Sequence, residues 1–136
     1  MQFDVQWHDP AANRAHLETL LGQVEDADLV VLPEMFSTGF SMEPEAIAEP
    51  EQGPTYHWLL AQAKRLNAVV TGGLVVQATD GTYRNRLYWA QPDGHAPYYD
   101  KRHLFRMAGE HEHYHAGDER LTVELKQRHS LHVCKG

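Results

Sequence analysis

The stretch Asp28-Leu29-Val30-Val31-Leu32-Pro33-Glu34 decides how the rest of the sequence is interpreted. After Asp28 it is apolar and rich in β-branched residues, which is typical of a short strand buried on both faces of a sheet. Pro33 ends this predicted strand, and Glu34 follows directly. Because open α/β sheets place their ligands at the carboxyl ends of strands, Glu34 is the first candidate functional residue.

Helices and strands alternate on either side of this stretch. Hydrophobic spacing predicts helices over residues 10–24 and 55–66 and a buried strand over residues 68–76. Residues 3–7, 82–91, 95–99 and 121–125 also have strand composition, and turn sequences stand at Asp80-Gly81 and Pro92-Asp93-Gly94. This order predicts an α/β layered fold with a mixed sheet.

Composition limits the classes of function. The 136 residues allow one domain, and 12 Lys plus Arg against 19 Asp plus Glu give a formal net charge of −7. This balance disfavours nucleic acid and anionic membranes as partners, and no apolar run is long enough to span a bilayer. The N-terminus does not resemble a secretory signal. A single cysteine, Cys134, cannot form an intrachain disulfide, so we expect a cytoplasmic protein.

Lys101 follows a second predicted strand end, after Tyr98-Tyr99-Asp100. Taken alone, Glu34 and Lys101 can each be an ordinary solvated side chain. The functional alternative makes Glu34, beside the apolar residues around it, a general base. Lys101 would then stabilise the oxyanion that develops on a reacting carbonyl.

The alternating residues His111, His113 and His115 would share one face if they lay on a strand, as metal ligands could. The alternative is a polar loop whose histidines face solvent. Because no cysteine or group of aspartates completes a ligand set, we expect no metal here.

Two segments together resemble a known family. Residues 32–40, Leu-Pro-Glu-Met-Phe-Ser-Thr-Gly-Phe, and residues 99–105, Tyr-Asp-Lys-Arg-His-Leu-Phe, resemble signatures of the carbon–nitrogen hydrolase (nitrilase) superfamily. The details are most similar to its bacterial omega-amidase branch. The likeness covers residues 2–126 and implies a partial α-β-β-α sandwich, with a mixed sheet flanked by helices on one face.

The resemblance implies a catalytic Glu–Lys–Cys triad with a second, supporting glutamate. Glu34 matches the general base, Lys101 the lysine and Glu110 the second glutamate, and the family needs no cofactor. We predict that these three residues converge on one pocket. Cys134 is the candidate nucleophile, although Lys135 and Gly136, which follow it, depart from the family pattern.

The family domain is about twice this length, so residues 1–136 are expected to be the amino-terminal part of a single domain, with a divergent tail from about residue 127. The implied reaction is hydrolysis of the terminal amide of small dicarboxylic monoamides, of the 2-oxoglutaramate class, by a protein that is a homo-oligomer at full length. The truncated chain is expected to be inactive and to expose the apolar sheet face opposite the helices. The alternatives are a non-catalytic fragment that binds a ligand or partner, and a histidine-based metal-binding module.

Overall fold

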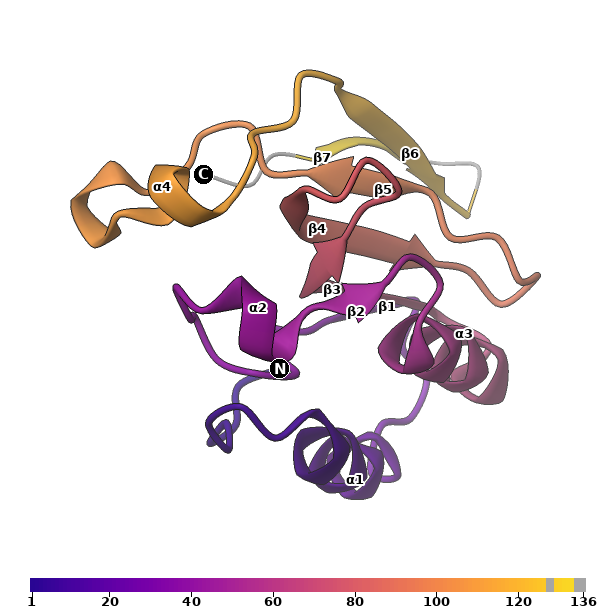
Figure 1. Ribbon diagram of the computed structural model, residues 1–136. Coiled ribbons are helices and arrows are strands. Elements are labelled where there is room, and N and C mark those ends of the chain that lie inside the picture. Colours follow the sequence, from indigo (N-terminus) through magenta and orange to yellow (C-terminus); the bar gives the residue numbers. More distant parts are fainter. Residues whose placement is uncertain (127–128, 134–136) are drawn as a thin grey trace.

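A mixed sheet in the centre of the molecule carries its two long helices, α1 (Pro10–Leu21) and α3 (Pro54–Leu66), on one face (Figure 1). The computed structural model describes residues 1–126 and the backbone of residues 129–133. The elements are α1 (Pro10–Leu21), β1 (Leu29–Val31), α2 (Pro44–Ile47), β2 (Glu49–Pro50), α3 (Pro54–Leu66), β3 (Val69–Gln77), β4 (Tyr83–Ala90), β5 (Tyr98–Asp100), the 3-10 helix η1 (Arg106–Ala108), α4 (Glu110–His113), β6 (Leu121–Leu125) and β7 (His129–Val133).

The strands of the main sheet follow the order β1-β3-β4-β5, with β2 also paired to β3. β1 is parallel to β3, while β4 is antiparallel to both β3 and β5. The parallel pair is joined through α3, and the antiparallel pairs are joined by short turns, as the alternation of period in the sequence predicted. The expected α/β fold is confirmed.

Helices α1 and α3 cover one face of the sheet because their apolar stripes meet alternate residues of β3. Leu17 and Leu21 of α1 and Leu59 of α3 pack in one core cluster with Val70 and Leu74. Proline occupies the first turn of both helices, where its missing N–H has no intrahelical partner to lose. α1 ends at Leu21, three residues before the predicted end, and Gly22 caps it.

The opposite face of β3 is covered, contrary to the expectation that it would be exposed. Val69 and Trp89 are buried against Val123 of β6. Val75 is buried with Met35 and Tyr114, which lie in loops after β1 and α4. The cover arises because the antiparallel hairpin β6–β7 folds back over this face (Figure 1). β7 itself was not predicted, since its sequence is largely polar.

Two strand predictions near the N-terminus are wrong. Residues 3–7 form no strand. The backbone N–H of Gln6 donates to the side chain of Asn13, while Phe3 packs against the core. β1 was expected to be buried on both faces, but it is the edge strand, and Val31 is 52% exposed. Within the described part of the chain, no helix is long and apolar enough to cross a membrane.

Candidate active site

Glu34 lies in a tight turn directly after β1. The next residue, Met35, has φ of 48°, in the left-handed region that costs a non-glycine residue about 1 kcal/mol. Its carbonyl accepts the N–H groups of Thr38 and Gly39 at 3.1 and 2.8 Å. Met35 is also fully buried, so packing offsets the strain. The turn therefore holds Glu34 at the carboxyl end of β1.

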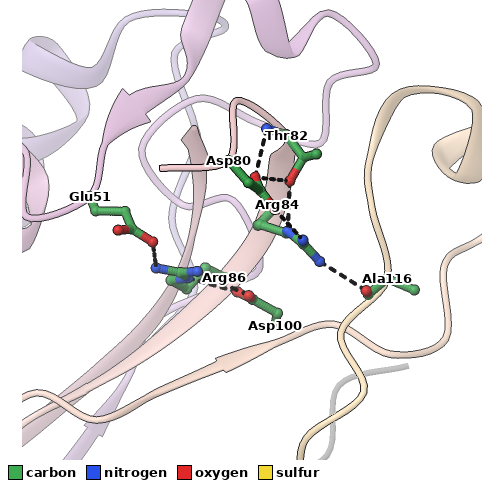
Figure 2. Close-up of polar contacts among 7 residues, drawn as sticks. All are labelled: Glu51, Asp80, Thr82, Arg84, Arg86, Asp100 and Ala116. Carbon is green, nitrogen blue, oxygen red and sulfur yellow. Dashed lines mark hydrogen bonds and ion pairs between the residues drawn. The ribbon is translucent and has the colours of Figure 1, made fainter. Parts of the chain in front are cut away.

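Lys101 follows β5, and an ion-pair network fixes the end of that strand. The buried Arg86 donates to both carboxylate oxygens of Asp100, from Nε at 2.7 Å and from Nη2 at 3.0 Å. Its Nη1 donates to Glu51 at 2.7 Å (Figure 2). Such a bidentate pair gives geometric specificity as well as energy. Since Asp100 precedes Lys101, this network positions the lysine.

Glu110 begins α4 and is completely buried. Gly109 precedes it with φ of 75°, which lets the chain turn from η1 into α4. The backbone N–H of Phe105 donates to Oε2 of Glu110 at 2.6 Å. The loop from residue 101 to residue 117 therefore closes around this carboxylate.

The end of the same loop is tied back to the sheet. His115 donates its N–H to the carbonyl of Tyr83, and Gly117 donates to the carbonyl of Lys101. Arg84 donates to the carbonyl of Ala116 at 2.9 Å and pairs with Asp80 (Figure 2). Backbone and side-chain contacts thus hold the loop that carries Glu110 against β4 and β5.

These elements bring Glu34, Lys101 and Glu110 into contact, although Glu110 does not belong to the lining of the cavity that Glu34 and Lys101 share. Nζ of Lys101 lies 3.2 Å from Oε1 of Glu34 and 2.9 Å from Oε2 of Glu110. Asn85 joins both carboxylates, because its Nδ2 donates to Oε1 of Glu34 and to Oε1 of Glu110, each at 2.7 Å. We name these four residues the carboxylate–lysine cluster.

Burial separates the two glutamates of the cluster. The side chain of Glu34 is 36% exposed, whereas that of Glu110 is inaccessible and that of Lys101 is 4% exposed. Burial alone would lower the pKa of Lys101, but the hydrogen bond to Glu110 and the charge of Glu34 outweigh it and raise that pKa. Lys101 is therefore a permanent cation at neutral pH, and Glu34 is the carboxylate that a ligand can reach.

Asn85 is the residue that sequence reasoning missed. It lies in the middle of β4, away from the strand ends on which the sequence-based prediction of the site depended. The signal was present in the sequence: Arg84, Asn85 and Arg86 are consecutive polar residues within a segment that otherwise has strand composition. Buried polar groups require hydrogen-bond partners. Because neighbouring strand residues face opposite sides of the sheet, Asn85 and Arg86 need partners on different faces.

Three other predictions need comment. Glu34 has polar partners, Asn85 and Lys101, as well as apolar residues beside it. His111 and His113 lie on α4, where residues two apart point to opposite sides, so they cannot share a face as strand residues would. Within the described part of the chain, no group of three or more potential ligand residues is arranged to hold a metal. Cys134 lies outside the described residues.

A cavity of about 710 Å³ opens over the cluster. Glu34 and Lys101 line it together with the apolar side chains of Phe40, Leu104 and Phe105. An accessible carboxylate beside a fixed ammonium can exchange a proton and stabilise negative charge at one point. The residues Met107, His103 and Arg106 complete the lining.

Known proteins resemble this chain in sequence and in structure. The chain is 45% identical over 126 residues to omega-amidase YafV of Yersinia enterocolitica, covering 93% of this chain and 48% of the relative. It is 29% identical over 128 residues to the 2-oxoglutaramate amidase of Bacillus subtilis, covering 92% of this chain and 49% of that protein. The chain therefore spans about half the length of these curated relatives.

Among solved structures, a CN-hydrolase superfamily protein of Xanthomonas campestris, with an arsenic adduct in its active site, superimposes with a TM-score of 0.88. It is 50% identical, and the match covers 93% of this chain and 48% of that one. The sequence profile of the carbon-nitrogen hydrolases matches residues 1–134. Since that match covers nearly all of the sequence, the chain belongs to the carbon-nitrogen hydrolase family.

Proposed function

We propose that residues 1–136 form the amino-terminal part of one carbon-nitrogen hydrolase domain and supply the base, the lysine and the supporting glutamate for amide hydrolysis. The observation that carries this proposal is the contact of Lys101 with both Glu34 and Glu110 beneath an open cavity. The substrate class is the terminal amide of small dicarboxylic monoamides such as 2-oxoglutaramate. The names of the Yersinia and Bacillus relatives support that class.

The roles follow from access and charge. Glu34, the accessible carboxylate, takes the proton of the nucleophilic thiol, and the thiolate attacks the amide carbon. Lys101 holds the resulting oxyanion. Ammonia leaves with the proton returned by Glu34, and a thioester remains. Water, deprotonated by the same carboxylate, then cleaves the thioester, which releases the acid and restores the thiol.

Glu110 and Asn85 act on the other two residues of the cluster. Glu110 has no access to substrate, and its charge keeps Lys101 protonated. Asn85 holds the two carboxylates in fixed orientations through its amide group. We propose that Cys134 supplies the thiol. We also propose that the reaction needs no cofactor. We also propose a cytoplasmic protein that is a homo-oligomer at full length and, with a net charge of −7, does not bind nucleic acid.

The chain alone is proposed to be inactive, because it matches about half of each relative. The test therefore uses two proteins: the 136-residue chain, and a chimera in which the matching 126-residue segment of this chain replaces its counterpart in the Yersinia relative. We expect ammonia release from 2-oxoglutaramate by the chimera only. In the chimera, Glu34→Gln and Lys101→Met should each lower kcat by about 10²–10⁴-fold.

Glu112→Gln is the matched control, since Glu112 is an exposed neighbour of Glu110. It should leave the activity of the chimera unchanged. An active chimera that tolerates Glu34→Gln would contradict the assigned roles. The alternative, a non-catalytic fragment that binds a ligand or partner, would be supported by an inactive chimera that still binds glutaramate.

A further inference from the structure

A second cavity, of about 500 Å³, lies in the loop that carries η1 and α4, the orange segment of Figure 1. We name it the basic groove, after its charged and titratable lining residues: Arg102, His103, Arg106, His111 and His115. Leu104, Tyr114 and Ala116 complete the lining, and no Asp or Glu belongs to it. This composition is unusual for a chain with a net charge of −7, and it favours an anionic ligand.

The basic groove adjoins the cavity over the carboxylate–lysine cluster. His103, Leu104 and Arg106 line both cavities. Arg106 therefore borders both the basic groove and the cavity that Glu34 and Lys101 line. Its side chain is exposed, and within the described part of the chain it forms no ion pair or hydrogen bond with a carboxylate.

The charge of the cluster explains why such a residue is needed. Glu34 and Glu110 carry two negative charges, and Lys101 carries one positive charge, so the cluster has a net charge of −1. A substrate with a free carboxylate is repelled by that charge, and Lys101 already contacts both glutamates. A second cation near the cavity mouth offsets the repulsion, and a guanidinium can bind a carboxylate with two parallel hydrogen bonds.

Part of the wall of the cavity over the carboxylate–lysine cluster is apolar. Leu104, Phe105 and Met107 line the cavity together with Arg106, Glu34 and Lys101, and Met107 is 91% exposed. The backbone of Phe105 is fixed by its hydrogen bond to Glu110, so its half-exposed ring is held at this wall. Such a surface suits the methylene chain of a short ω-amide.

We propose that Arg106, with His103 beside it, binds the free carboxylate of the monoamide while the amide end reaches Glu34 and Lys101. The proposal rests on the proposed function for its substrate class, but it concerns binding and not turnover. The basic groove would then select amides that carry a carboxylate at the end opposite the amide group.

The test is a binding titration, by NMR, of the 136-residue chain with glutaramate and with pentanamide, which has the same chain length but no carboxylate. We expect tighter binding of glutaramate. Arg106→Gln should weaken glutaramate binding about tenfold, the scale of one charge-assisted hydrogen bond, and leave pentanamide binding unchanged. Arg106→Lys keeps the charge but loses the planar guanidinium. Its affinity for glutaramate should lie between that of the unchanged chain and that of Arg106→Gln.

Arg120→Gln is the matched control, because Arg120 is an exposed arginine that lines a different cavity. It should bind both ligands as the unchanged chain does. Equal binding of glutaramate by Arg106→Gln and Arg120→Gln would overturn the proposal, as would equal affinity of the unchanged chain for the two ligands. Inorganic phosphate that binds more tightly than glutaramate would also overturn it, since the groove would then be a general anion site.

The outcome is separable from that of the proposed function. Binding needs no nucleophile, so an inactive chimera with Arg106-dependent glutaramate binding would refute the amidase activity and leave the carboxylate site standing. An active chimera whose preference for charged amides survives Arg106→Gln would refute the carboxylate site alone.

Discussion

Nζ of Lys101 lies 2.9 Å from Oε2 of Glu110, and both side chains are almost completely removed from solvent. Breaking a buried pair by removal of one partner costs far more than the pair itself contributes, because the remaining charge stays buried. Among the residues that the structure describes, Lys101 is the cation that pairs with Glu110. The stability of this loop therefore depends on the lysine.

Lys101→Met is expected to lower the free energy of unfolding by about 3–5 kcal/mol, because it leaves two carboxylates side by side without a counter-ion. Equilibrium urea unfolding measures the change. The matched control is Lys126→Met, which removes an exposed lysine paired with Asp28 and should cost less than about 1 kcal/mol. Equal losses of unfolding free energy in the two variants would show that the buried contact stabilises the protein no more than the exposed ion pair does.

The same contact predicts a pH dependence. The pKa of Lys101 is raised above its ordinary 10.5 in the folded protein, so folding favours the protonated lysine. Its stabilisation is therefore fully present below pH 10.5 and is lost as the pH rises through the higher folded value. We expect the difference in stability between the unchanged chain and Lys101→Met to stay constant from pH 7 to 10 and to shrink above that range. A difference that shrinks already between pH 7 and 9 would contradict the raised pKa.

Asn85→Asp should place a third carboxylate between Glu34 and Glu110. Like charges at such distances raise the pKa of at least one carboxyl group, so the folded variant takes up a proton more readily than the unfolded one. Its stability is then highest at low pH and falls as the pH rises through the raised value. Urea unfolding should therefore give a larger loss at pH 8 than at pH 5.

The control for this variant is Asn67→Asp, at the exposed left-handed residue that ends α3. Its effect should be small and equal at the two pH values. A loss that is independent of pH in Asn85→Asp would mean that the amide contributes through shape and not through charge.

Gly117 contacts β5 so closely that no side chain fits. An added Cβ would collide with the carbonyl oxygen of Asp100 and lie 2.8 Å from its Cβ. Gly117→Ala should therefore push the loop away from Lys101, at a cost of about 1–3 kcal/mol. Gly22→Ala, whose Cβ would meet nothing closer than 3.3 Å, is the matched control and should cost less in thermal unfolding. Similar melting temperatures for both variants would contradict the close approach.

The hairpin β6–β7 is predicted to cover apolar surface. Val123→Asp places a charge against Val69 and Trp89 and should detach the hairpin, so that a dye specific for exposed hydrophobic surface binds more strongly. Thr122→Asp, on the exposed side of β6, is the control and should change dye binding little. Strong dye binding by the unchanged chain would instead support the expectation that its sheet face is open.

The sequence indicated much of this arrangement because two kinds of local signal were strong. Glu34 and Lys101 each follow a strand with a clear apolar or aromatic composition. Both residues could therefore be identified from the predicted ends of these strands. Asn85 could not be located in this way, since its role depends on β4 lying between the turn after β1 and the loop after β5. The exposure of Val31 likewise follows from strand order, which no local pattern encodes.

Residues 129–133 form a strand that their sequence did not predict. Residues 129–133 lack the alternation that marks a strand, yet they pair with β6 in an antiparallel register. Backbone hydrogen bonds with a neighbour form this pairing, and composition alone does not report them. Residues 3–7 have the alternation but form no strand, and the backbone N–H of Gln6 donates to the side chain of Asn13.

The spacing of the cluster along the chain has a consequence for synthesis. Glu34 is separated from Asn85 by 51 residues and from Lys101 by 67. A ribosome delivers Glu34, both long helices and β3 before any other member of the cluster exists, and closing such long loops costs conformational entropy. A nascent chain paused near residue 100 therefore holds Glu34 and Asn85 but lacks Lys101 and the second carboxylate, Glu110, that Asn85 binds. The corner of the sheet that carries the cluster is completed only when Glu110 and the return through Gly117 leave the exit tunnel.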